Sequence, residues 1–147
     1  MHHDLCIARL KNIGVKPDIL GSNIIGAIGQ RLIRKLCIHC KAAKKPNEQE
    51  KKILGLSLNE EIIIYEAPGC IKCEFMGYKG RISILEICKL DSGLEALISS
   101  DAGPSEVKEY AIKHGYKTLA DDGLRRVILG DTSIEEVSRV VDLTDRM

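Results

Sequence analysis

Two pairs of cysteines carry the clearest chemistry in this 147-residue sequence. Cys37 and Cys40 form one Cys-x2-Cys pair, and Cys70 and Cys73 form a second, with 29 residues between the pairs. Two thiols three positions apart can point at one centre, so two such loops supply the four soft ligands of a tetrahedral metal ion. Thiolates held close together repel one another, and a divalent cation is the natural way to hold them. The four cysteines therefore predict a structural metal site, with zinc as the default metal and iron as the chemical alternative.

The thiols have two alternative uses, disulfide bonds and redox chemistry. Two disulfides need an oxidising compartment, whereas a thioredoxin-like redox site needs only one Cys-x2-Cys. Six cysteines and no recognisable signal peptide in these residues favour a reducing compartment. His39 lies between two of the thiols and could replace one, but four thiols suffice, so we expect it to face solvent. Cys6 and Cys88 fall in apolar stretches and are expected to be small core residues.

The charge of the chain is nearly balanced but unevenly placed. The formal net charge is +1, so a strong general affinity for nucleic acid is not expected. Residues 31–52, named here the basic stretch, hold eight Lys or Arg against two Glu, which gives 8 − 2 = +6. This surface could compensate a four-thiolate centre, or it could face phosphate or anionic lipid. No apolar run approaches the ~20 residues that cross a bilayer, so any membrane association would be peripheral.

Residues 1–36 must lead the chain into the first thiol pair. A helix is expected around residues 4–13, and a second from Pro17 through Ile28. Three glycines in that second helix would be tolerated only where another backbone approaches closely. A strand is expected over residues 30–36. A helix followed by a strand looks like the tail of a larger α/β sheet rather than a complete fold.

Residues 37–90 form the predicted metal module. Asn47 and Glu50 have the spacing of a capping box, which would start a short helix. The β-branched run at residues 61–65 and the alternating run at residues 82–87 predict two strands. The module is therefore expected to combine two thiol loops, one helix and flanking strands.

Residues 91–147 read as helical. Asp91, Pro104, Thr118 and Ser133 each stand where an N-terminal signal would begin a helix. No catalytic constellation is found in this part. The sequence as a whole predicts an α+β fold.

Several of these runs resemble one family. Residues 29–40 resemble the approach to the metal site in type II secretion and type IV pilus assembly ATPases, and residues 69–73 followed by 77–81 resemble its continuation. The resemblance spans nearly the whole chain, in the family's order. Residues 9–15, 118–124 and 130–137 fit the same family.

The resemblance implies a hexameric, RecA-like motor that works at the cytoplasmic side of the bacterial inner membrane as a peripheral protein. Such a motor uses ATP and Mg to assemble a pilus or pseudopilus and to secrete protein. Its expected partners are further copies of itself and the inner-membrane platform proteins. The charge of the basic stretch makes anionic lipid a further candidate, and nucleic acid is not expected. On this basis, residues 1–36 would be the C-terminal edge of a RecA-like domain, residues 37–90 a tetracysteine zinc module, and residues 91–147 a C-terminal helical subdomain.

Motifs for nucleotide hydrolysis are not found in the sequence. No Gly-x4-Gly-Lys-Ser/Thr phosphate loop is present, and the nearest Gly-rich stretch, residues 26–30, has no Lys. The resemblance places the Walker B, aspartate and histidine boxes before residue 1, so His2 and His3 are not the histidine box. We therefore expect a C-terminal zinc-binding fragment of the motor that does not hydrolyse ATP alone.

One residue of the run at 77–81 could still act on nucleotide. This run is expected to be a tight turn with exposed basic residues at its tip. Within this run, Arg81 matches an arginine of the family that would reach nucleotide phosphate or a subunit contact. Arginine suits this role because its guanidinium can bind phosphate through two hydrogen bonds. The alternatives are that Arg81 pairs with Glu86 or is solvated.

A function of a different class also remains open. The chain could be a stand-alone zinc-binding adaptor or nucleic-acid-binding module that uses the basic stretch. The shortage of aromatic residues for base stacking weighs against this alternative.

Overall fold

A computed structural model describes residues 6–146, with the side chains of residues 9–146. Over this part of the chain, the fold is α+β, with seven α-helices and two two-stranded sheets. The helices are α1 (Cys6–Asn12), α2 (Pro17–Asn23), α3 (Glu48–Leu54), α4 (Ser92–Ser99), α5 (Pro104–Lys113), α6 (Leu119–Ile128) and α7 (Ile134–Val140). The strands are β1 (Gly26–Leu36), β2 (Ala42–Lys44), β3 (Ile64–Glu66) and β4 (Tyr78–Lys89), and the short 3-10 turns are η1 (Ile71–Cys73) and η2 (Thr144–Arg146).

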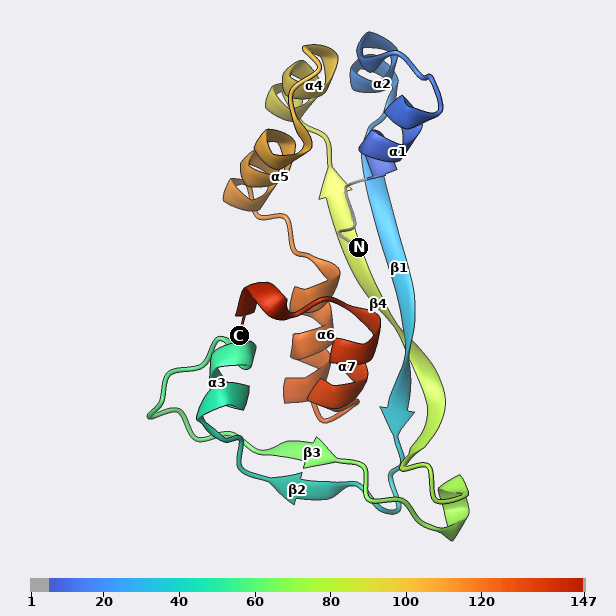
Figure 1. Cartoon of the computed structure of the whole chain (residues 1–147), viewed down its shortest axis with the longest axis vertical. Coiled ribbons are helices and arrows are strands. Elements are labelled where there is room, and N and C mark those ends of the chain that lie inside the picture. Colours follow the sequence, from blue (N-terminus) through green and yellow to red (C-terminus); the bar gives the residue numbers. More distant parts are fainter. Residues whose placement is uncertain (1–5, 147) are drawn as a thin grey trace. The chain divides into compact units, whose positions relative to one another are not determined.

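The chain divides into two compact units, each built from two separate segments. Unit 1 comprises Met1–Gly29 and Leu85–Thr118, and unit 2 comprises Gln30–Ile84 and Leu119–Met147. Strands β1 and β4 form one sheet and run in opposite directions (Figure 1). The two compact units do not coincide with the three blocks of sequence, residues 1–36, 37–90 and 91–147. The three-domain division and the RecA-like origin of the first block remain predictions.

Unit 1 has its own aliphatic core, as the composition predicts. Helices α2 and α4 approach so closely that a Cβ added at Gly21 would lie 2.7 Å from the carbonyl oxygen of Glu95. Helix α4 begins as expected, because the carboxylate of Asp91 accepts a hydrogen bond of 2.9 Å from the Leu94 amide. The buried residues of this core are Leu20, Cys88, Leu90, Leu94, Ile98, Val107 and Ala111.

The second expected helix is wrong beyond Asn23. Helix α2 stops there, and the residues up to Ile28 turn into the start of β1 instead. Glycine and β-branched isoleucine both weaken a helix, and isoleucine favours a strand where a partner strand is available. Here β4 is that partner. Just beyond the paired strands, the Leu90 amide donates a hydrogen bond of 3.1 Å to the Ile25 carbonyl. The close approach expected of the glycines is found at Gly21.

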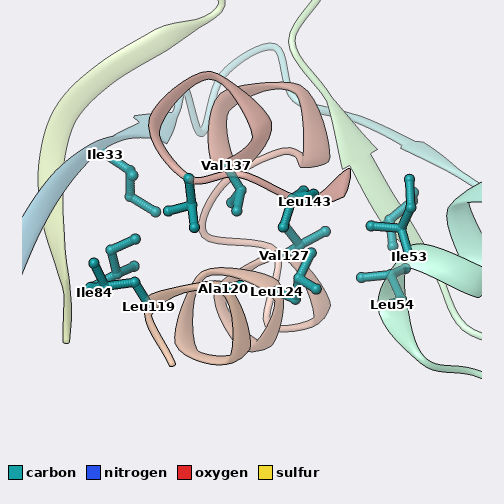
Figure 2. Packing of buried hydrophobic residues seen from close by; sticks show 12 residues of the cluster. Ile33, Ile53, Leu54, Ile84, Leu119, Ala120, Leu124, Val127, Val137 and Leu143 are labelled. Carbon is teal, nitrogen blue, oxygen red and sulfur yellow. The ribbon is translucent and has the colours of Figure 1, made fainter. Parts of the chain in front are cut away.

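Unit 2 packs its core around α6 and α7. Figure 2 shows Ile33 of β1 and Ile84 of β4 on one side of these helices, and Ile53 and Leu54 of α3 on the other. The predicted capping box of α3 is confirmed. The full cluster of buried residues is Ile33, Ile53, Leu54, Ile64, Ile84, Leu119, Ala120, Leu124, Val127, Val137, Val141 and Leu143.

The strands of unit 2 depart from the sequence prediction in two places. Strand β3 is short and pairs antiparallel with β2, which was not predicted, so that Ala43 faces Tyr65. The expected tight turn at residues 77–81 is wrong, because β4 already begins at Tyr78. Tyr78 is buried and its hydroxyl lies 2.6 Å from Ser133 Oγ, so this side chain draws the backbone into the strand.

Candidate metal centre

The four cysteine thiols meet in unit 2. Their sulfur atoms all lie within 4.8 Å of one another. The Sγ–Sγ distance is 4.0 Å between Cys37 and Cys70, and 3.8 Å both between Cys40 and Cys73 and between Cys70 and Cys73. Four tetrahedral Zn–S bonds of ~2.3 Å place sulfurs about 3.8 Å apart, whereas a disulfide requires about 2.05 Å. The four free thiols therefore fit one tetrahedral metal ion.

The first thiol loop follows directly from β1. The amide of Cys37 donates a hydrogen bond of 2.9 Å to the carbonyl of Gly77, which ties the loop to the start of β4. The amides of Cys40 and Lys41 then fold back onto the Cys37 carbonyl at 3.3 and 2.9 Å. This reverse turn brings the two sulfurs of the pair to the same side of the backbone.

The second thiol loop is built by η1. Its amides fold back in the same way, with Cys73 and Phe75 donating to the Cys70 carbonyl at 3.1 and 2.9 Å. The loops themselves lack glycine, but Gly69 and Gly77 flank the second pair at φ angles of 92° and 76°. A Cβ on Gly77 would lie 2.5 Å from the backbone oxygen of the facing Ala67, so this position requires glycine.

Backbone amides and burial shift the thiol pKa values in opposite directions. Burial raises the pKa of Cys73, but hydrogen bonds of 3.2 Å from the amides of Cys70 and Gly77 outweigh it and leave that pKa at about 7. Burial, together with hydrogen bonds to neighbouring thiols, raises the pKa of Cys40 to about 12. The surroundings therefore favour the thiolate of Cys73 and disfavour that of Cys40.

The segment between α6 and α7 fixes the first loop from the other side. The amide of Leu36 donates to the carbonyl of Asp131 at 2.9 Å, and Thr132 Oγ1 donates to the carbonyl of Arg34 at 2.9 Å. Lys41 donates to the carbonyl of Gly130 at 2.9 Å, and its ammonium lies 4.4 Å from the centre of the Tyr65 ring. Residues on both sides of the first thiol pair are therefore held by the segment between α6 and α7.

A buried ion cluster anchors the same region. The carboxylate of Glu136 is inaccessible to solvent and pairs with Arg34 at 2.6 Å and with Arg139 at 2.8 Å. Burial alone would raise the pKa of Glu136, but hydrogen bonds from both guanidinium groups lower it to about 2. The Glu136 amide donates a hydrogen bond of 3.2 Å to Ser133 Oγ, which caps α7 at the expected residue, whereas the Glu136 carboxylate does not complete a capping box. The spacing of Ser133 and Glu136 gave no sign of this cluster.

The other sequence candidates lie apart from the sulfurs. His39 is exposed, as expected, and is not part of the cluster. Cys88 is a buried core residue of unit 1, as expected, and the side chain of Cys6 lies outside the described residues. Arg81 is exposed on β4, and among the described residues its guanidinium has no hydrogen-bond or ion-pair partner.

Most of the basic stretch is engaged within unit 2. Arg34 and Lys41 have the partners given above, and Lys44 pairs with Glu50 at 2.6 Å. Lys45 pairs more loosely with Glu61 at 3.4 Å, and Lys51 donates to a backbone carbonyl. These contacts favour a compensating role for the stretch over a continuous cationic surface.

The fold and the thiol cluster define an α+β protein with a candidate four-cysteine metal centre. The family model described as "Type II/IV secretion system protein" matches residues 4–139, and the chain belongs to this family. The resemblance stated from the sequence motifs is thereby confirmed.

Curated relatives are named as type II secretion or type IV pilus assembly ATPases. The type II secretion system ATPase E of Vibrio cholerae is 37% identical over 134 residues, which are 91% of this chain and 26% of the relative. The type IV pilus assembly ATPase TfpB of Acinetobacter baylyi is 39% identical over 94% of this chain and 24% of the relative. The type IV pilus assembly ATPase PilB of Thermus thermophilus is 39% identical over 133 residues, which are 89% of this chain and 15% of the relative. The chain thus spans about a quarter or less of the length of these relatives.

Proposed function

We propose that this chain is the C-terminal, zinc-binding region of a hexameric ATPase that drives type II secretion or type IV pilus assembly. The observation that carries the proposal is the convergence of the four thiols of two distant loops in a chain of this family. A structural zinc would join residues 37–40 to residues 70–73 and so stabilise unit 2, which contains both loops. Zinc is preferred over iron because a structural site needs no redox chemistry.

The whole motor would supply the chemistry that this region does not. ATP and Mg would bind to the longer ATPase, whose RecA-like domain would end with residues 1–36 of this chain. The region would help to organise the hexamer and to dock it on inner-membrane platform proteins, at the cytoplasmic face of the membrane. None of the described helices is both long and apolar enough to span a bilayer, and the proposed membrane association is peripheral.

A paired assay of the purified chain tests this proposal. We expect the chain to retain about one zinc per molecule after dialysis and to release no phosphate from ATP, because it has no phosphate loop. Zinc-independent ATP turnover by the pure chain would overturn the proposed division of labour.

Arg81 is the residue of this region proposed to act on nucleotide or on a neighbouring subunit. Its exposed guanidinium and the lack of a described partner leave its phosphate-binding geometry available. In the intact motor, Arg81→Ala is expected to lower ATP turnover by about tenfold or more while the zinc content stays unchanged. Unchanged turnover would remove the role.

A stand-alone adaptor or nucleic-acid module is the second candidate. The local partners of the basic stretch weigh against it, because they leave fewer cations for phosphate. Micromolar, salt-sensitive binding of an oligonucleotide by the purified chain would favour it instead.

A further inference from the structure

Four large apolar side chains project around the candidate metal centre. Ile38 and Ile71 are 78% and 79% exposed, and Phe75 and Met76 are 73% and 60% exposed; we name these four residues the metal-loop tip. Ile38 follows Cys37 and Ile71 follows Cys70, and the sulfurs of these two cysteines are 4.0 Å apart, so the two isoleucines belong to neighbouring loops. Side chains exposed to this extent project from a surface rather than line a groove.

The backbone holds this apolar group outward in an unusual conformation. Phe75 is the only phenylalanine of the chain, and it follows Glu74 in the left-handed region, at φ angles of 61° and 53°. Residues other than glycine seldom adopt this conformation, and such residues gather at binding sites. The amides of Phe75 and Met76 donate to the carbonyls of Cys70 and Cys73 at 2.9 and 3.0 Å, so the second thiol loop itself maintains the conformation.

Exposed cations lie within and after the second thiol loop. Lys72, Lys79 and Arg81 are exposed and are opposed within residues 67–81 by Glu74 alone, which gives 3 − 1 = +2. Lys79 donates to the carbonyl of Lys72 at 3.3 Å, which keeps its ammonium beside η1. A four-thiolate zinc would carry a formal charge of −2, so the metal centre and residues 67–81 together would be about neutral. Any attraction of anions would then come from the exposed ammonium and guanidinium groups at the surface, not from a net positive charge.

We propose that the metal-loop tip inserts into the surface of an anionic lipid bilayer. Projecting isoleucine, phenylalanine and methionine beside lysine and arginine match the two layers of such a surface, acyl chains below and anionic headgroups above. In Figure 1 the loop lies beyond the C-terminal end of β1, as the short yellow-green turn. The inference rests on the proposed function only in that a metal would hold the two loops together.

Vesicle binding by the full chain tests this inference. Wild type is expected to float with phosphatidylcholine vesicles that contain about 30% phosphatidylglycerol, and less with phosphatidylcholine alone. The double variant Phe75→Ser with Ile71→Ser should bind about tenfold more weakly, because it removes two of the four inserted apolar side chains. Leu58→Ser is the matched control, since Leu58 is 66% exposed in the same unit but lies outside the tip. It should change binding by less than about twofold.

Fluorescence gives a direct readout of insertion. The chain contains no tryptophan, so the variant Phe75→Trp carries a single probe. Its emission should shift to the blue with anionic vesicles and be quenched by brominated acyl chains. The variant Leu58→Trp should show neither change.

The outcomes separate this inference from the proposed metal. Equal vesicle binding by wild type and the double variant, or an unshifted Phe75→Trp spectrum, would overturn the insertion. The zinc content of the same samples tests the metal site independently of membrane insertion. If a metal-free chain still binds vesicles through the tip, the proposed zinc site is rejected and the insertion is retained. Tip variants that bind vesicles normally but abolish pilus assembly or secretion would assign the tip to a protein partner and overturn the lipid proposal.

Discussion

At the scale of single residues, the six cysteines have different roles that can be tested by substitution. Cys73 is buried among the sulfurs and accepts two amide hydrogen bonds, whereas Cys88 is buried in the apolar core of unit 1. Cys73→Ala should lose most of the bound zinc and lower the thermal midpoint by about 10 °C or more. Cys88→Ala should keep the zinc. Equal zinc retention by both variants, measured by elemental analysis, would reject the ligand assignment.

Glu136 is the buried charge on which the attachment of α7 to β1 depends. Glu136→Gln would leave Arg34 and Arg139 without their common carboxylate and should destabilise the chain by about 2–3 kcal/mol, since both arginines are partly exposed. Glu135→Gln, on the exposed side of the same helix, should change stability by less than about 0.5 kcal/mol. Urea unfolding measures both, and similar losses would contradict the role of the cluster.

The depressed pKa of Glu136 also predicts a pH dependence. The folded pKa of about 2 lies below the ordinary 4.5, so the stabilisation is complete above pH 4.5. It should be lost as the pH falls from about 4.5 toward 2, because the unfolded carboxyl binds its proton first. Comparing wild type with Glu136→Gln in urea at pH 7 and at pH 3 measures this contribution, and a difference that does not shrink at pH 3 would contradict it.

At the scale of elements, the contact between α2 and α4 depends on Gly21. A Cβ there would meet the backbone oxygen of Glu95, which cannot move without distorting α4. Gly21→Ala should therefore destabilise unit 1 by about 1–3 kcal/mol. Gly103→Ala is the control, because no atom lies within 4 Å of its added Cβ, and it should cost less than about 1 kcal/mol. Equal effects in thermal unfolding would show that the helices do not pack as described.

The sequence predicted those elements whose signals are local. Asp91 and the pair Asn47 and Glu50 cap their helices with their own side chains, so spacing alone was informative. The start of β1 before Gln30 and the strand at Tyr78 depend instead on partners distant in sequence, namely β4 and Ser133. Local propensity could not reveal either partner.

The candidate site shows the same contrast. The spacing of the cysteines predicts that the two thiols of each pair converge, because each pair is a local turn. That the two pairs meet follows from the four ligands of a tetrahedral metal ion. The contact of Lys41 with Gly130, beyond the end of α6, joins residues 89 positions apart. The pairing of Arg34 with Glu136 joins residues 102 positions apart. Such contacts are set by the packing of unit 2, which periodicity does not specify.

At the scale of the whole molecule, the two units should respond differently to loss of metal. Both thiol loops belong to unit 2, whereas unit 1 has a separate buried core. A chelator should raise amide hydrogen exchange in α3 and β3 by at least about tenfold and leave α4 and α5 within about threefold of the untreated protein. A sample dialysed with excess zinc is the control. Uniform exchange throughout the chain, or no change at all, would contradict a metal that acts through unit 2.

X-ray absorption at the zinc edge, with elemental analysis of the same sample, tests the four-sulfur ion most directly. Protein purified under reducing conditions should contain about one zinc per chain, surrounded by about four sulfur atoms at ~2.3 Å. A spectrum dominated by nitrogen or oxygen ligands would contradict the account. A metal-free chain whose fold does not respond to added zinc or chelator would contradict it equally.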